Sequence, residues 1–148
     1  MNIRTILVPT DFSPDAAEAL ATAVEFAKLF DAKIVIAHAF HVTVAVATPI
    51  GGGYSLPAGF YEDIRNDANQ RVQKLAAEVS GQGVSATGIA LSEPASLAIV
   101  NEAERLPADL IVMGTRGLTG VKHVVLGSVA ERVVRGAPCP VLTVKASN

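Results

Sequence analysis

The chain has 148 residues, the size of one ordinary domain, and 50% of them are hydrophobic, which supports a core and excludes disorder over most of the chain. Lys and Arg number 12 against 14 Asp and Glu, so the net charge is −2 and no nucleic acid partner is expected. The single cysteine excludes an internal disulfide. No apolar run approaches the roughly 18 residues of a membrane helix, and the N-terminal run is too short for a signal peptide. We therefore expect one cytoplasmic domain over residues 1–148, with no membrane association.

The first elements form a strand, a helix and a second strand. A continuous apolar run over residues 5–8 predicts the first strand. Ser13 and Pro14 then provide a hydroxyl N-cap and a first-turn proline, and the helical pattern ends at Asp31. The apolar residues with helical spacing are Ala17, Leu20, Val24 and Ala27. A second strand is predicted over residues 33–38.

A long loop follows the second strand. Residues 41–60 contain three consecutive glycines and two prolines, and we predict a flexible loop because segments of this length in compact domains are usually functional or disordered. Residues 61–80 form the clearest amphipathic helix, which Gly81 and Gly83 end. A third strand is predicted over residues 84–91.

The last third of the chain repeats this alternation. A helix is predicted over residues 94–105, with its period marked by Leu97, Val100 and Ala103 or Glu104. The remaining elements are a strand over 110–113, a short helix over 128–135 and a strand over 141–144.

Apolar strands that alternate with amphipathic helices predict an α/β fold with a parallel sheet covered on both faces. By analogy we predict a Rossmann-like open sheet of five strands in the order 3-2-1-4-5, with about four helices. Such sheets bind ligands outside the carboxyl ends of the strands where the order reverses, here between the first and fourth strands. The segments 9–11 and 114–117 follow these two strands.

Glycines are concentrated between the fourth strand and the next helix. Gly114, Gly117 and Gly127 allow the backbone to approach a ligand closely, and a helix that starts at Ser128 offers unpaired N–H groups suited to phosphate. The side chains of Arg116 and Lys122 are candidate cations for such a site. Alternatively, the glycines form only turns and a helix cap. The P-loop pattern and the dinucleotide fingerprint are both absent from the sequence.

One spacing in this region resembles a family motif: Gly114-x-x-Gly117 is followed by nine residues and then by Gly127-Ser128. This spacing is similar to the G-2x-G-9x-G-[ST] pattern of the ATP-binding branch of the universal stress protein family. The other segments that resemble this family are 6–13, 37–39, 108–114 and 138–144. Together they span essentially the whole chain in the family's order. The resemblance implies the family's fold, which is adenine nucleotide alpha hydrolase-like.

The resemblance also implies a site for ATP or another adenine nucleotide, with Mg²⁺ held through the phosphates rather than by protein side chains. The residues implied around adenine and ribose are Pro9, Thr10, Asp11, Ala39, Met113 and Gly114. Those implied around the phosphates, mainly through backbone N–H groups, are Arg116, Gly117, Gly127, Ser128 and Val129. In this arrangement Asp11 would accept hydrogen bonds from ribose hydroxyls.

No catalytic residue is assigned. Asp11 could be a base near bound phosphate, but we favour ribose binding or helix capping because no second group suited to phosphoryl transfer is evident. Slow ATP turnover stays open, whereas efficient ATPase activity is not supported. The three histidines, His38, His41 and His123, do not form a recognisable metal site. Cys139 is expected to be a small buried residue rather than a reactive thiol.

In the predicted order the last strand, 141–144, is an edge whose unpaired backbone groups favour pairing with a second copy. The resemblance likewise implies a homodimer through Val141 to Val144. We expect a stress-response sensor or regulator in which bound nucleotide orders the loop 114–127. An unknown protein partner would recognise the surface that this ordering changes. Two alternatives are a slow ATP hydrolase and a dimeric interaction module with an empty pocket.

Overall fold

The computed structural model describes residues 2–42, 57–118 and 125–147. The strands are β1 (Thr5–Pro9), β2 (Lys33–Ala39), β3 (Ala86–Leu91), β4 (Leu110–Gly114) and β5 (Val141–Val144). The helices are α1 (Pro14–Phe30), α2 (Phe60–Ser80), α3 (Ala95–Arg105) and α4 (Ser128–Gly136). Most of the predicted 41–60 loop, together with Lys122 and His123, lies outside the described residues.

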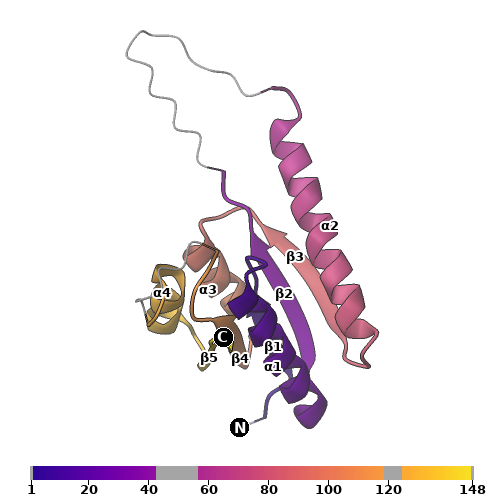
Figure 1. Cartoon of the computed structure of the whole chain (residues 1–148), viewed down its shortest axis with the longest axis vertical. Helices are drawn as coiled ribbons and strands as arrows, with labels where there is room; N and C mark the ends of the chain where they lie inside the picture. Colours follow the sequence, from indigo (N-terminus) through magenta and orange to yellow (C-terminus); the bar gives the residue numbers. More distant parts are fainter. Residues whose placement is uncertain (1, 43–56, 119–124, 148) are drawn as a thin grey trace.

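Five parallel strands form one sheet in the order β3-β2-β1-β4-β5. Helices α1 and α2 pack on one face, and α3 and α4 pack on the other (Figure 1). Along β1, Ile6 and Val8 belong to the core under α1 and α2, whereas Leu7 belongs to the core under α3 and α4. The predicted Rossmann-like α/β fold and strand order are therefore confirmed.

Local signals explain the ends of α1. Ser13 Oγ accepts a hydrogen bond from Ala16 N at 3.2 Å, as expected for an N-cap. Asp31 ends the helix in the left-handed conformation, with φ of 54°. The predicted buried face is wrong at Ala17, which is exposed, because the helix buries Ala16 and Ala19 instead.

The buried face of α3 also differs from the prediction. Leu97 is 53% exposed, whereas Ala98, Ile99 and Glu102 are buried. This helix has only 11 residues and carries apolar side chains around much of its circumference, so their spacing does not distinguish one face. Within the described residues, no helix is both long and apolar enough to span a membrane.

The sheet opens where its strand order reverses. The register between β1 and β2 runs from Thr5 to Pro9, but the register between β1 and β4 includes only Ile6 and Leu7. The carboxyl ends of β1 and β4 therefore separate, which is the position where open α/β sheets place a ligand.

Candidate functional site

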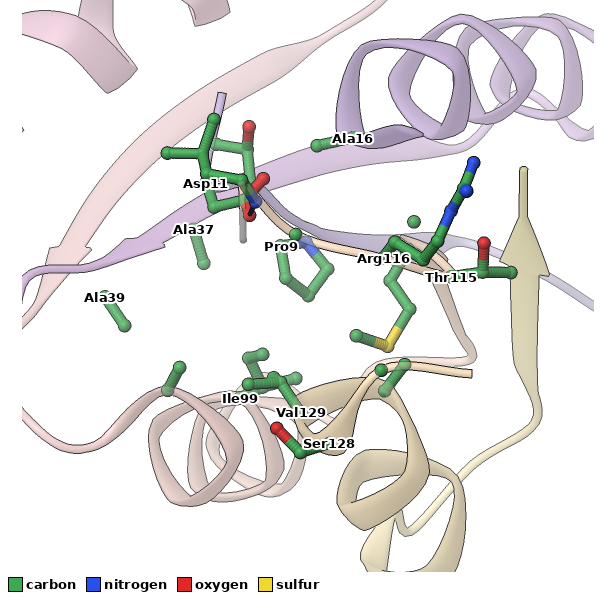
Figure 2. A pocket seen from close by; sticks show the side chains of 18 of the residues that line it. Pro9, Asp11, Ala16, Ala37, Ala39, Ile99, Thr115, Arg116, Ser128 and Val129 are labelled. Carbon is green, nitrogen blue, oxygen red and sulfur yellow. Dashed lines mark hydrogen bonds between the residues drawn. The ribbon is translucent and has the colours of Figure 1, made fainter. Parts of the chain in front are cut away.

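A cavity of about 590 Å³ occupies this end of the sheet, between β1, β2, α3 and the start of α4 (Figure 2). Its volume lies within the range of small-molecule sites. The structure brings every predicted site residue to its wall, namely Pro9, Thr10, Asp11, Ala39, Met113, Gly114, Arg116, Gly117, Gly127, Ser128 and Val129. Segments 9–11 and 113–117, distant in the sequence, thus meet in one cavity.

One end of the cavity is apolar, and the sequence prediction missed part of it. Ala37, Leu91, Ala95 and Ile99 also line the wall. Ala37 lies two residues before Ala39, so both side chains point to the same side of β2, and Ala95 lies one helical turn before Ile99. Small side chains leave the space here. A flat apolar group fits this end of the cavity.

The other end of the cavity is formed by the start of α4. Gly127 is the N-cap of α4, no side chain caps the helix, and the first intrahelical bond runs from Glu131 N to Gly127 O at 2.9 Å. The amides of Ser128 and Val129 precede that bond and so have no partner within the helix. Ser128 and Val129 lie across the open space from Pro9 and Asp11 (Figure 2). This end suits an anionic group.

The glycines around the cavity provide space rather than unusual backbone angles. A Cβ at Gly117 would lie 2.6 Å from Asp11 Oδ2, and a Cβ at Gly127 would lie 3.1 Å from Thr115 O. Neither glycine has a positive φ. At both positions the missing side chain makes room for other atoms of the protein. The close approach of this backbone to a ligand stays a prediction.

Asp11 connects the two segments that form the cavity. Its Oδ1 accepts a hydrogen bond from Ser13 N at 3.0 Å, and its Oδ2 accepts one from Leu118 N at 3.0 Å. The first bond lies just before α1 and holds Ser13, which is the N-cap of that helix in place of Asp11. The second holds the turn after β4 against the end of β1.

The turn after β4 offers fewer free amides than the sequence predicts. Arg116 N donates to Asp15 Oδ2 at 3.2 Å, and Gly127 N donates to Thr115 O at 2.7 Å. The Arg116 guanidinium points away from the open space (Figure 2), and its Nε lies 3.3 Å from Asp15 Oδ2. The prediction that the Arg116 side chain supplies positive charge to the cavity is therefore wrong for this structure. Among the described residues, the start of α4 is left as the principal candidate for contact with an anion.

Asp15 is a buried acid in the first turn of α1, where the helix dipole favours negative charge. Its side chain is 7% exposed, and it accepts hydrogen bonds from Thr115 Oγ1 at 2.8 Å and Ala146 N at 3.1 Å as well as from Arg116. Burial alone would raise the pKa of Asp15. The bonds from Thr115, Arg116 and Ala146, together with the Arg116 charge, outweigh burial and lower this pKa below its ordinary value of 3.8.

Asp15→Asn is expected to lower the free energy of unfolding at pH 7 by about 2 kcal/mol, because the neutral amide cannot replace the charged acceptor. A lowered pKa means that Asp15 stabilises the fold above pH 3.8 and loses this contribution as the pH falls through its folded value. Urea denaturation of both proteins at pH 7 and pH 3 should show a smaller difference at pH 3. Glu18→Gln, at an exposed position of the same helix, is the control. An equal difference at both pH values would contradict this assignment.

Other candidate residues have structural partners. The Nδ1 atom of His38 lies 2.8 Å from Thr10 O. Cys139 is half-buried, and burial together with the nearby Asp109 charge raises the pKa of its thiol, so the thiol stays protonated at neutral pH. In the described parts of the chain, no three His, Cys, Asp or Glu side chains come together as a metal site.

These features define a class of protein: an open parallel α/β sheet with a ligand-sized cavity at the point where the strand order reverses. Comparison with known proteins then gives the family. The family model described as the universal stress protein family matches residues 2–145. The chain is 39% identical to universal stress protein MJ0531 of Methanocaldococcus jannaschii, over 96% of this chain and 82% of that protein.

Two solved structures are also similar. Hypothetical protein MJ0577 superposes with a TM-score of 0.82 at 25% identity, over 100% of this chain and 99% of its own. The universal stress protein from Archaeoglobus fulgidus, solved in complex with dAMP, superposes with a TM-score of 0.69 at 25% identity, over 98% and 100%. The chain belongs to the universal stress protein family.

Proposed function

We propose that the cavity binds an adenine nucleotide, ATP or a close relative, and that its occupancy regulates a cytoplasmic stress-response protein. The observation that carries this proposal is the pairing, within one cavity, of an apolar end at Ala39 and Ile99 with the uncapped start of α4 at Ser128. A purine base suits the first end, and a phosphate suits the second. The family relative solved with dAMP supports an adenine nucleotide as the ligand.

Each wall of the cavity is proposed to contact a different part of the nucleotide. Ala39 and Met113 contact the base, and Pro9 and Thr10 border the sugar. The Asp11 carboxylate, already fixed by two amides, accepts a ribose hydroxyl. Gly114 flanks the nucleoside beside Met113. The remaining proposed contacts, around the phosphates, are Arg116, Gly117, Gly127, Ser128 and Val129, and the amides of Ser128 and Val129 have no partner within the helix. Mg²⁺ would be held by phosphate oxygens and water, which is usual for this ion.

The proposed assembly is a homodimer of single-domain chains. Strand β5 has β4 as its neighbour in the sheet and lies at the edge. Its four residues, Val141 to Val144, are each partly exposed and carry no charge. Pairing with the same strand of a second copy would satisfy the free backbone groups of this edge. Such a dimer would present one joint surface to a regulatory protein.

Mass spectrometry of the protein purified without added ligand tests the binding. We expect denaturation to release an adenine nucleotide in near-stoichiometric amount, because a preformed cavity retains a tight ligand. Calorimetric titration with ATP and AMP covers the case of a ligand lost during purification. If no nucleotide is released and no heat of binding is detected, the proposal of nucleotide binding is contradicted. That result would favour the interaction module with an empty pocket.

Two further measurements on the same preparation separate the remaining alternatives. Sedimentation velocity at micromolar concentration should show a dimer, and a monomer with and without nucleotide would contradict the assembly. Phosphate release above a protein blank that Asp11→Ala abolishes would identify a slow hydrolase instead. We expect no such release, because Arg116, the one cation among the described lining residues, is paired with Asp15 and is not directed at the cavity.

A further inference from the structure

A buried carboxylate joins three segments that are far apart in the sequence. Asp15, in the first turn of α1, accepts hydrogen bonds from Thr115 and Arg116 in the turn after β4, and from Ala146 after β5. These partners lie 100, 101 and 131 residues away along the chain. The first two line the cavity, whereas the third follows the edge strand.

The backbone at Asp15 lies so close to Gly114 that no side chain would fit at that glycine. A Cβ at Gly114 would lie 2.9 Å from Asp15 Cβ and 3.0 Å from Ala16 N. The start of α1 therefore lies directly against the end of β4. This contact fixes the distance between Asp15 and the turn that begins at Thr115.

The hydrogen-bonding capacity of the carboxylate is fully used. Its two oxygens accept from Thr115 Oγ1, Arg116 N, the Arg116 guanidinium and Ala146 N. A carboxylate offers about four lone-pair positions, so a change in one bond is not absorbed by a spare position. Thr115 Oγ1 and Arg116 N bond Oδ2, whereas Ala146 N bonds Oδ1, so the two oxygens of one carboxylate group hold the turn and the chain after β5. A rotation of this group that follows a change in the turn would alter the bond to Ala146.

A second contact connects the same two segments. Thr115 N donates to Val144 O at 2.9 Å, directly beyond the β4–β5 register, which ends at Gly114 and Val144. The chain after β5 is thus held at Val144 by the turn and at Ala146 by Asp15. Both anchors lie beside the edge of the sheet.

We propose that Asp15 is a positioning residue that couples the ligand cavity to the end of the edge strand β5. A ligand that orders the turn 115–117 would, through Asp15, also order residues 144–146. This inference rests on the proposed function, because it requires an adenine nucleotide in the cavity. It gives that function a route by which occupancy changes the surface that a second copy or a partner contacts.

Amide hydrogen exchange of Ala146, measured by NMR with and without ATP and Mg²⁺, tests the coupling. In the unchanged protein we expect ATP to slow this exchange by about 10-fold, equivalent to strengthening one hydrogen bond to a charged acceptor. In Asp15→Asn the response to ATP should fall below about 2-fold. Asp109→Asn is the matched control, because Asp109 Oδ2 also accepts hydrogen bonds from two backbone amides, Arg4 N and Thr5 N, both at 2.9 Å. Asp109 does not line the cavity. The control should keep the full response.

Calorimetry on the same samples separates the two proposals. ATP binding without any change at Ala146, or an equal change in Asp15→Asn, overturns the coupling and leaves the proposed function intact. The absence of ATP binding to the unchanged protein overturns both. Should Asp15→Asn fail to fold, Thr115→Val removes a single donor to Asp15 and should at least halve the response. A full response in Thr115→Val would then overturn the coupling.

Discussion

Gly117→Val is expected to weaken adenine nucleotide binding by about 30-fold, the equivalent of about 2 kcal/mol. The reason is geometric: a Cβ at this position would lie 2.6 Å from Asp11 Oδ2, so the carboxylate must move away. That movement breaks its bond with Leu118 N and removes it from the position proposed to accept the ribose hydroxyl. The free energy of unfolding should change by only about 1 kcal/mol, since one exposed hydrogen bond is lost.

Calorimetric titration with ATP and urea denaturation measure these two quantities on the same protein. Gly127→Val is a second probe, because its Cβ would lie 3.1 Å from Thr115 O and disturb the start of α4. Gly136→Ala is the matched control, since its Cβ would make an ordinary contact of 3.6 Å with Val100. Unchanged ATP affinity in both valine variants would mean that the ligand does not lie against this turn.

The parts of the fold that the sequence predicted depend on local chemistry. Ser13 and Pro14 identify the start of α1, because capping involves only neighbouring residues. Continuous apolar runs such as Ile6–Val8 identify buried parallel strands, since both faces of such strands are covered. The carboxyl ends of parallel strands share one edge of the sheet. For that reason, the order of the elements along the chain is enough to assign segments 9–11 and 114–117 to one site.

The parts that the sequence did not predict depend on partners that are distant in the chain. Asp15 follows the rule for a first-turn acid, and nothing near it in the sequence indicates Thr115 or Ala146. The direction of the Arg116 side chain depends on this same carboxylate. A local pattern therefore identified Arg116 as part of the cavity wall but assigned its charge to the wrong partner.

The apolar end of the cavity was also predicted only in part. On α3, the prediction selected Leu97 rather than Ile99, because a short helix with several small residues has no dominant apolar stripe. Packing against β2 decides the face, and that contact is tertiary. Ala37 and Ala39 illustrate the same point, since an alanine in a strand does not reveal whether it fills a core or leaves a cavity.

Gly88→Val is expected to lower the free energy of unfolding by about 3 kcal/mol or to prevent folding, because α2 crosses β3 at this residue. A Cβ at Gly88 would lie 2.5 Å from Val72 O and 2.7 Å from Val72 C, and backbone atoms inside a helix cannot rotate away. The helix would have to move off the strand, which also breaks the bond from Gln73 Nε2 to Gly88 O at 2.9 Å. Val72, fully buried at this crossing, would lose its packing.

Urea denaturation followed by circular dichroism measures the loss, with Gly136→Ala again as the control that should stay within about 1 kcal/mol of the unchanged protein. The crossing lies outside the cavity wall, so any folded fraction of Gly88→Val should bind ATP with unchanged affinity. This result would separate the stability of the sheet from the function of its ligand site. A variant as stable as the unchanged protein would show that α2 can move away from β3 at little cost, contrary to the close packing at Gly88.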